Sequence, residues 1–219
     1  MHHVVAASRK GYAGLIPALE QATGDRFTLI EDRADFTAEA LERIAPRFVF
    51  LPHWSYIIPA EIHERFECVI FHMTDLPFGR GGSPLQNLIT RGIYETKVSA
   101  LRCVRELDAG PVYLKRPLSL HGNAEEIFLR GAELVREMVV EIIRTKPEPQ
   151  PQQGEVVSFS RRRPEQSDIA ALTDLRQVYD YIRMLDADGY PPAFIEVGGL
   201  RLEFSRAALK NGEIVADVR

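Results

Sequence analysis

The chain has 219 residues, of which 45% are hydrophobic and 26% are charged, so it can bury a core in one full domain with a smaller appendage. The net charge of -4 gives no overall attraction to nucleic acid, and no apolar run is long enough to span a membrane. The two cysteines are too isolated for a disulfide framework and the start of the chain lacks the apolar stretch of a signal peptide, so we expect a cytoplasmic protein with neither membrane nor nucleic-acid partners.

The first 145 residues alternate short apolar runs with amphipathic segments, a pattern that favours a sheet covered by helices. In chain order, we predict strands over residues 4–7, 27–30, 48–51 and 68–71, and helices over residues 12–21, 37–44, 59–66 and 85–91. Further strands are expected at 97–104 and 110–114, followed by a long amphipathic helix over residues 124–145. The pattern predicts an α/β fold.

A Pro- and Gln-rich segment, residues 147–154, cannot continue this helix and indicates a boundary. We therefore divide the chain into a domain of residues 1–146, a linker of residues 147–154 and a small C-terminal subdomain of residues 155–219. The subdomain is predicted to contain a strand at 156–159, a helix over 174–185, and a hairpin of residues 194–197 and 200–204 that turns at two adjacent glycines.

The pattern most informative about function surrounds His72, which leaves an apolar run for a Gly/Pro-rich loop, with Asp108 following 36 positions later. Ligands of open α/β sheets gather at the carboxyl ends of strands, where we place the loops at His53, His72 and Asp108. A histidine can relay a proton near neutral pH and a buried carboxylate can orient it, so the pair suits attack by an amine on a carbonyl. From the residues alone, the alternative is that His72 and Asp108 only cap a strand and a turn.

Other residues near this pair also allow two interpretations. The backbone between Gly79 and Gly82 could approach an anion with Arg80 as counter-charge, or the glycines could simply form a tight turn. Trp54 could stack on a flat ring or cover core residues, and for the cluster of residues 161–163 we favour a solvated face. The histidines lack metal-ligand spacing, so we predict no metal.

Residues 72–84 and the turn of residues 107–110 resemble folate-dependent formyltransferases. The loop of that family runs histidine, small residues, Leu-Pro, an Arg-Gly pair and Pro, and it is matched here by His72, Leu76-Pro77, Arg80-Gly81 and Pro84. The family's later Leu-Asp-x-Gly turn is matched by Leu107-Asp108-Ala109-Gly110. The resemblance extends to residues 53–59, where the family places its loop around the pterin, and more weakly into residues 159–165 and 182–194.

The resemblance implies a Rossmann-like formyltransferase domain, N10-formyltetrahydrofolate as co-substrate, and His72 and Asp108 as catalytic residues. It implies a set of cofactor contacts: Leu51, His53, Trp54, Ser55, Ile57, Arg105, Glu106 and Leu107. Acceptor contacts would come from Thr74, Arg80, Gly81 and Gly82.

One position departs from the family, whose catalytic asparagine lies two residues before the histidine, where this chain has Ile70. Loss of one such donor to a developing oxyanion costs about 3 kcal/mol of transition-state stabilisation. Replacement donors could be Thr74, Ser55, His53 or a backbone N–H of the glycine loop.

The short C-terminal helix and hairpin resemble nucleotide-sugar N-formyltransferases, and residues 71–89 most resemble the pseudaminic-acid type. This implies formyl transfer to a nucleotide-linked amino sugar, a UDP-4-amino-4,6-dideoxy sugar, in surface glycan biosynthesis, with a homodimer formed through the tail. The alternatives are a catalytically impaired formyl-folate or nucleotide-sugar binding protein, a methionyl-tRNA formyltransferase-like enzyme, and a formyl-folate hydrolase. The methionyl-tRNA alternative is disfavoured here by the short segment after the linker and by the lack of a basic surface.

Overall fold

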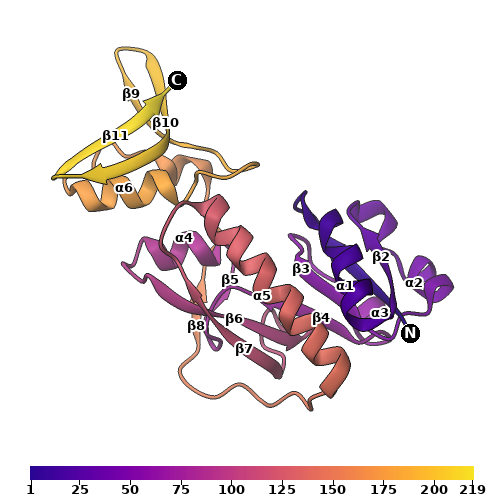
Figure 1. Cartoon of the computed structure of the whole chain (residues 1–219). Helices are drawn as coiled ribbons and strands as arrows, with labels where there is room; N and C mark the ends of the chain where they lie inside the picture. Colours follow the sequence, from indigo (N-terminus) through magenta and orange to yellow (C-terminus); the bar gives the residue numbers. More distant parts are fainter.

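The apolar run at the start of the chain is buried because it lies in β1 (His2–Ala7), within a six-stranded sheet ordered β2-β1-β3-β4-β6-β7 (Figure 1). The computed structural model describes residues 1–219. The parallel strands are β1, β2 (Arg26–Ile30), β3 (Val49–His53) and β4 (Cys68–His72). The antiparallel strands are β6 (Glu95–Arg102) and β7 (Val112–Ser119). The expected α/β, Rossmann-like class is confirmed.

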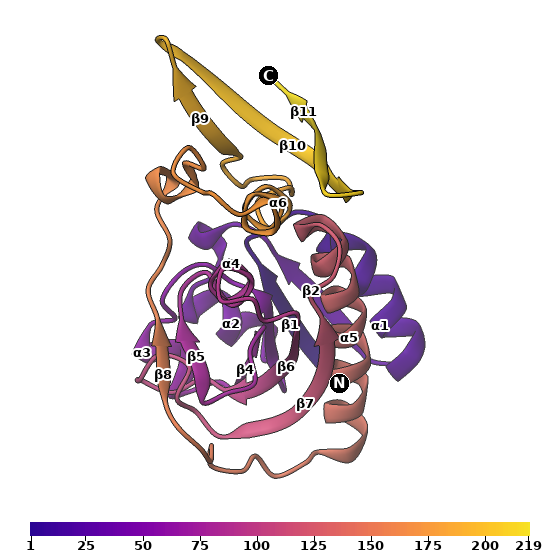
Figure 2. The same ribbon diagram turned by 90° about the vertical axis from the view of Figure 1, so that its left-hand side faces the viewer.

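Helices cover both faces of this sheet, because successive residues of a strand point to opposite sides. Val5 of β1 joins the core beneath α1 (Leu15–Thr23) and α5 (Ala124–Thr145). Val4 joins a second core beneath α2 (Ala38–Ile44) and α3 (Ala60–His63). Figure 2 shows α1 and α5 side by side on one face of the sheet. A 3-10 turn over Tyr12–Gly14 precedes α1, so the helix predicted from residue 12 begins three residues later as an α-helix.

The long helix α5 has the bounds expected from its sequence, because local signals define both of its ends. At the start, the Asn123 side chain accepts a hydrogen bond from the Glu126 N–H, and the Glu126 carboxylate accepts one from the Asn123 N–H. At the end, Lys146 adopts a left-handed conformation with φ 46°. Apolar residues at helical spacing, including Val135, Met138 and Ile142, are buried against the sheet.

The glycine-rich segment expected as a loop is instead partly a strand, β5 (Phe78–Gly81), paired in parallel with β8 (Val157–Phe159). A Cβ on Gly81 would lie 2.3 Å from the Phe159 carbonyl oxygen, so this close pairing requires glycine. The segment predicted as a linker therefore runs back along the first domain, and Gln150 forms a bridge with Val112. Helix α4 (Pro84–Ile89) follows β5.

The C-terminal subdomain consists of α6 (Leu175–Arg183) and a three-stranded antiparallel sheet ordered β11-β10-β9. Its strands are β9 (Ala193–Val197), β10 (Leu200–Lys210) and β11 (Glu213–Val218). The predicted hairpin turn is present, with Gly198 and Gly199 at φ 57° and 80°. The third strand was not predicted, although an Asn-Gly pair at 211–212 precedes it and adopts the same turn conformation. In Figure 1, α6 lies between this sheet and the first domain.

A buried ion pair attaches the subdomain to the first domain. Arg183 of α6 is 2% exposed and donates hydrogen bonds to Asp180 at 2.6 Å and to the carbonyl oxygens of Leu120 and Gly122 at 2.6 and 2.7 Å. The Tyr94 hydroxyl also donates to Asp180, at 2.6 Å. These contacts fix α6 beside the start of α5.

Apolar residues are exposed at the tip of the C-terminal hairpin, where Val197 and Leu200 are 56% and 65% exposed. Such exposure fits the expected dimer contact, which stays a prediction. None of the helices combines the length and the apolar character needed to cross a bilayer. No cluster of three or more potential metal-ligating residues is present.

Candidate functional site

A pocket of about 520 Å³ opens where the carboxyl ends of β3 and β4 meet the turn that contains Asp108. Its walls come from the loops after β3 and β4, from the start of α4 and from the turn between β6 and β7. Phe128 of α5, Arg161 and Tyr190 also line it, so the C-terminal half of the chain contributes to the pocket. The volume lies within the range of about 300 to 1,000 Å³ that is usual for ligand sites.

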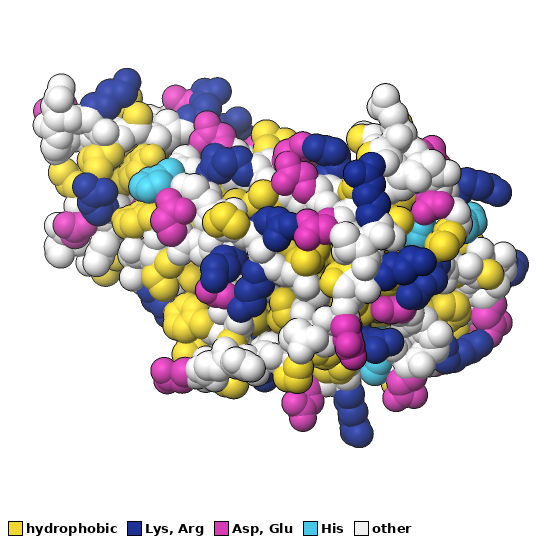
Figure 3. Space-filling model, turned by 60° about the horizontal axis from the view of Figure 1, so that its bottom comes forward, with side chains coloured by type: hydrophobic (Ala, Val, Ile, Leu, Met, Phe, Trp, Pro, Cys, Tyr) yellow, Lys and Arg dark blue, Asp and Glu magenta, His cyan; other side chains and the backbone are white.

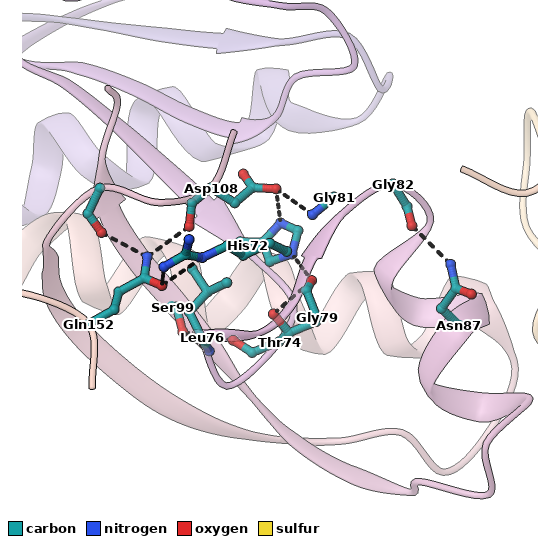
Figure 4. Close-up of polar contacts among 12 residues, drawn as sticks. His72, Thr74, Leu76, Gly79, Gly81, Gly82, Asn87, Ser99, Asp108 and Gln152 are labelled. Carbon is teal, nitrogen blue, oxygen red and sulfur yellow. Dashed lines mark hydrogen bonds and ion pairs between the residues drawn. The ribbon is translucent and has the colours of Figure 1, made fainter. Parts of the chain in front are cut away.

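The structure brings His72 and Asp108 together, as the sequence predicted. Both are 7% exposed, and the His72 Nδ1 lies 3.7 Å from the Asp108 Oδ2 (Figure 4). The Gly79 carbonyl lies 2.8 Å from Nε2 and can only accept, so Nε2 carries a proton. In neutral His72 the Nδ1 lone pair therefore faces the carboxylate. This arrangement can take up a proton at Nδ1, because Asp108 and the Gly79 carbonyl would both stabilise the resulting imidazolium.

The Asp108 turn is held in a strained conformation by its neighbours. Asp108 has φ 51°, in the left-handed region that few side chains adopt. Its Oδ2 accepts a hydrogen bond from the Gly81 N–H at 2.8 Å. A Cβ on Gly110 would lie 1.8 Å from the Arg102 carbonyl oxygen, so only glycine allows this turn to approach β6.

Sequence reasoning missed Asn87, which fixes the glycine loop. Its Nδ2 donates to the carbonyl oxygens of Gly82, Ser83 and Ser160 at 3.0, 3.1 and 2.9 Å. One amide thus joins the loop before α4 to the segment after β8, and Figure 4 shows its contact with Gly82. The available signal was the position of Asn87 in the first turns of a helix that follows a glycine run.

Most of the predicted cofactor and acceptor residues line the pocket: Leu51, His53, Trp54, Ser55, Ile57, Gly81, Gly82, Arg105, Glu106 and Leu107. The structure does not bring Thr74 and Arg80 there. Thr74 is fully buried and its hydroxyl donates to the Gly79 carbonyl at 3.4 Å. The Arg80 guanidinium donates to the Oε1 of Gln152 at 2.7 and 3.1 Å, so its charge is directed away from the pocket.

The pocket wall includes Ile70, which stands where the family has its asparagine donor. Among the candidate replacements for that donor is His53, whose backbone carbonyl accepts a hydrogen bond from Ser8 while its ring has no hydrogen-bond partner within the chain. Its imidazole packs edge-on against Phe128, with ring centroids 5.5 Å apart. Burial, together with the nearby Arg9 guanidinium, lowers the pKa of His53 to about 4. His53 is therefore neutral near pH 7, and its one ring N–H could donate a hydrogen bond to a ligand. The Ser55 hydroxyl accepts a hydrogen bond from the Ser8 hydroxyl at 3.1 Å, which leaves its own O–H available to donate as well.

Comparison with known proteins gives a consistent set of relatives. Residues 164–219 match the family described as "Methionyl-tRNA formyltransferase, C-terminal domain". A solved structure named methionyl-tRNA formyltransferase from Clostridium thermocellum is 48% identical, with a TM-score of 0.97, and the match covers 100% of this chain and 98% of that one.

Two further relatives are more distant. The methionyl-tRNA formyltransferase of Pelobacter propionicus is 28% identical over 82% of this chain and 59% of its own. The chain spans about half the length of the curated relatives it matches. A sugar N-formyltransferase from Shewanella sp FDAARGOS_354 has a TM-score of 0.73 over 94% of this chain and 96% of its own, but its 13% identity supports only a shared fold.

These findings overturn the nucleotide-sugar acceptor that the tail and residues 71–89 had suggested. The inference relied on a C-terminal segment too short for a methionyl-tRNA formyltransferase, yet the Clostridium thermocellum protein of that name matches this chain over nearly its whole length. Subdomain length therefore does not distinguish the two acceptors.

The expectation of no nucleic-acid partner is wrong for the same reason, since the names of these relatives designate a tRNA substrate. A net charge of -4 describes the whole surface and says little about a local contact. Figure 3 shows acidic and basic side chains intermixed over one face, with neither sign dominating it.

Proposed function

Because this chain belongs to the formyltransferase family, we propose that it transfers the formyl group of N10-formyltetrahydrofolate to the amino group of methionyl-tRNA. The observation that carries the proposal is the 48% identity with the Clostridium thermocellum methionyl-tRNA formyltransferase over the whole chain. The pocket, whose lining includes His72 and Asp108 at 3.7 Å from each other, supports the same chemistry. The whole of this activity, including the acceptor, is our proposal.

The pocket fits the folate co-substrate in size and lining. A long, partly aromatic ligand suits a cavity of about 520 Å³ whose walls include Trp54, Ile57 and Leu107. These residues would hold the ring system, while Arg105 and Glu106 supply polar groups at the turn beside Asp108. The bound co-substrate supplies an activated formyl carbon.

His72 and Asp108 would perform the proton transfer. As the amine nitrogen bonds to the formyl carbon, His72 accepts the amine proton at Nδ1, and Asp108 stabilises the imidazolium across 3.7 Å. His72 then returns this proton to the leaving N10 when the carbon–N10 bond breaks, so the enzyme ends the cycle unchanged. His53 would offer its neutral N–H to the ligand in the part of the pocket where Ile70 offers no donor.

The test is incubation of the protein with N10-formyltetrahydrofolate and methionyl-tRNA, with N-formylmethionine measured by mass spectrometry after deacylation. We expect product with the charged tRNA, none with uncharged tRNA, and none with His72→Asn. His121→Asn is the matched control because His121 is exposed and is not part of the pocket lining. Formate release in the absence of tRNA would refute transfer in favour of hydrolysis, and folate binding without either product would indicate a binding protein.

A further inference from the structure

We propose that Gln152 is a positioning residue that holds the side chains of His72 and Asp108 in the relative position that catalysis requires. This inference rests on the proposed formyl transfer. Gln152 lies in the segment that the sequence presented as a linker, outside the set of residues that the family resemblance identified. Its side chain is nevertheless the point where the Asp108 turn and β5 meet (Figure 4).

Gln152 uses both ends of its amide. The Nε2 donates to the carbonyl oxygens of Asp108 and Gly110 at 2.7 and 2.8 Å, which are the backbone groups on either side of Ala109 in the turn. The Oε1 accepts from the Nε and Nη2 of Arg80 at 3.1 and 2.7 Å. All four contacts are within hydrogen-bond distance, so one side chain bridges two segments that lie far apart in sequence.

Arg80 connects this amide to the catalytic pair through the peptide groups of its two neighbours. On one side, the Gly79 carbonyl accepts from the His72 ring at 2.8 Å. On the other side, the Gly81 N–H donates to the Asp108 carboxylate at 2.8 Å. The contacts therefore form a closed ring, from the Asp108 carbonyl to Gln152, from Gln152 to Arg80, and from the peptide group after Arg80 back to the Asp108 carboxylate. The peptide group before Arg80 connects His72 to the same ring.

The pair needs such support because its own contact is loose. The His72–Asp108 separation of 3.7 Å exceeds that of a hydrogen bond, and Asp108 has an unfavourable positive φ. A displacement of about 1 Å at a catalytic group can reduce the rate about 100-fold. Between Asp108 and Gly110 the other backbone hydrogen bond is a long one, 3.3 Å from the Ala109 N–H to the Glu106 carbonyl, and the 2.9 Å bond from the Arg102 N–H to the Pro111 carbonyl lies one residue beyond the turn.

Attachment of the segment to the first domain does not explain these contacts. Gln150 already pairs with Val112 through two backbone hydrogen bonds of 2.8 and 2.9 Å. β8 pairs with β5 further along the chain. The Gln152 amide is therefore not needed to attach the segment, and its contacts with the Asp108 turn call for another explanation. The same amide also provides a hydrogen-bond acceptor for Arg80, whose side chain lies outside the pocket.

The test compares Gln152→Ala and Gln152→Met with the matched control Gln153→Ala, since Gln153 is an exposed neighbour of the same type. We expect kcat for formyl transfer to fall about 100-fold in both Gln152 variants, because Met keeps the length of the side chain but makes none of the hydrogen bonds. KM for N10-formyltetrahydrofolate should stay close to that of Gln153→Ala, and both variants should remain folded by circular dichroism. Wild-type kcat in Gln152→Met would overturn the proposal.

A second readout does not depend on the acceptor. In ¹⁵N-labelled protein, the NMR titration of the His72 ring should move in Gln152→Met and stay unchanged in Gln153→Ala, because only the first loosens Asp108. If the wild-type protein fails to formylate methionyl-tRNA, the proposed function fails while this titration still tests Gln152. An unchanged His72 titration in a folded Gln152→Met protein would refute the positioning role.

Discussion

Replacing His53 by Gln should remove part of the acid sensitivity of the folded protein. Burial and the Arg9 guanidinium lower the pKa of His53 from its ordinary 6.5 to about 4. In the unfolded chain this ring binds a proton as pH falls through about 6.5, whereas in the folded protein it does so only near 4. Between these values the unfolded state holds more protons, so stability rises with pH and is lost as pH falls.

The size of the effect follows from the same pKa values. Each pK unit corresponds to about 1.4 kcal/mol, so His53 contributes a loss of about 2 to 3 kcal/mol between pH 7 and pH 4. The buried His3, whose pKa is also lowered by burial, adds a loss of the same sign that is common to wild type and variant. The difference between the two proteins therefore isolates His53.

The assay is urea unfolding followed by circular dichroism at several pH values between 4 and 7, for wild type and His53→Gln. We expect the free energy of unfolding of the wild type to fall by about 2 to 3 kcal/mol more than that of the variant. His63→Gln is a suitable control because it makes the same substitution at a histidine outside the pocket lining, at the end of α3. Parallel stability curves for wild type and His53→Gln would refute the reasoning and show that His53 is charged or solvated in the folded state.

Three further predictions follow from the contacts described. Arg183→Met should lower the free energy of unfolding by about 3 to 5 kcal/mol in urea titrations, because it leaves Asp180 buried without its cation; a change below 1 kcal/mol would contradict this. Gly110→Ala should lower the thermal midpoint far more than Gly14→Ala, whose added Cβ meets no atom within 4 Å and whose φ is not positive, and equal losses would show that the turn can shift away from β6. Asp108→Asn should reduce kcat at least about 100-fold while calorimetry shows folate binding unchanged, so retained turnover would exclude Asp108 from proton transfer.

The elements that sequence predicted well are those specified by local signals. The helix α5 was located to the residue because its apolar spacing and the Pro-rich segment after it are local signals, and the cap formed by Asn123 and Glu126 in the structure begins the helix at the same place. Strands β1, β3 and β4 were also found, since continuous apolar runs are typical of strands buried on both faces. Both β6 and β7 were found with shifted ends, because their polar outer residues weaken the pattern.

Features that depend on distant pairing were missed. Nothing near Phe78 indicates that residues 78–81 form a strand, because the partner strand lies at residues 157–159. The composition of the pocket was likewise only partly predictable, because some of its lining residues come from segments distant in sequence. Its strand-end residues were predicted from their loops, but Phe128 and Tyr190 come from a helix and a tail whose approach to the site depends on the whole fold.

The return of the chain along β8 bears on how this protein can be divided. A fragment ending at Lys146 would contain His72 and Asp108 yet lack the strand that pairs with β5, the Ser160 carbonyl that Asn87 binds, and the amide of Gln152. Truncations and chimaeras that exchange the C-terminal subdomain should therefore keep residues 147–162 with the first domain and join the foreign segment beyond them. The border suggested by composition therefore lies about one strand and its flanking turns before the last contact of this segment with the start of α4, the hydrogen bond from the Arg162 N–H to the Ser83 hydroxyl.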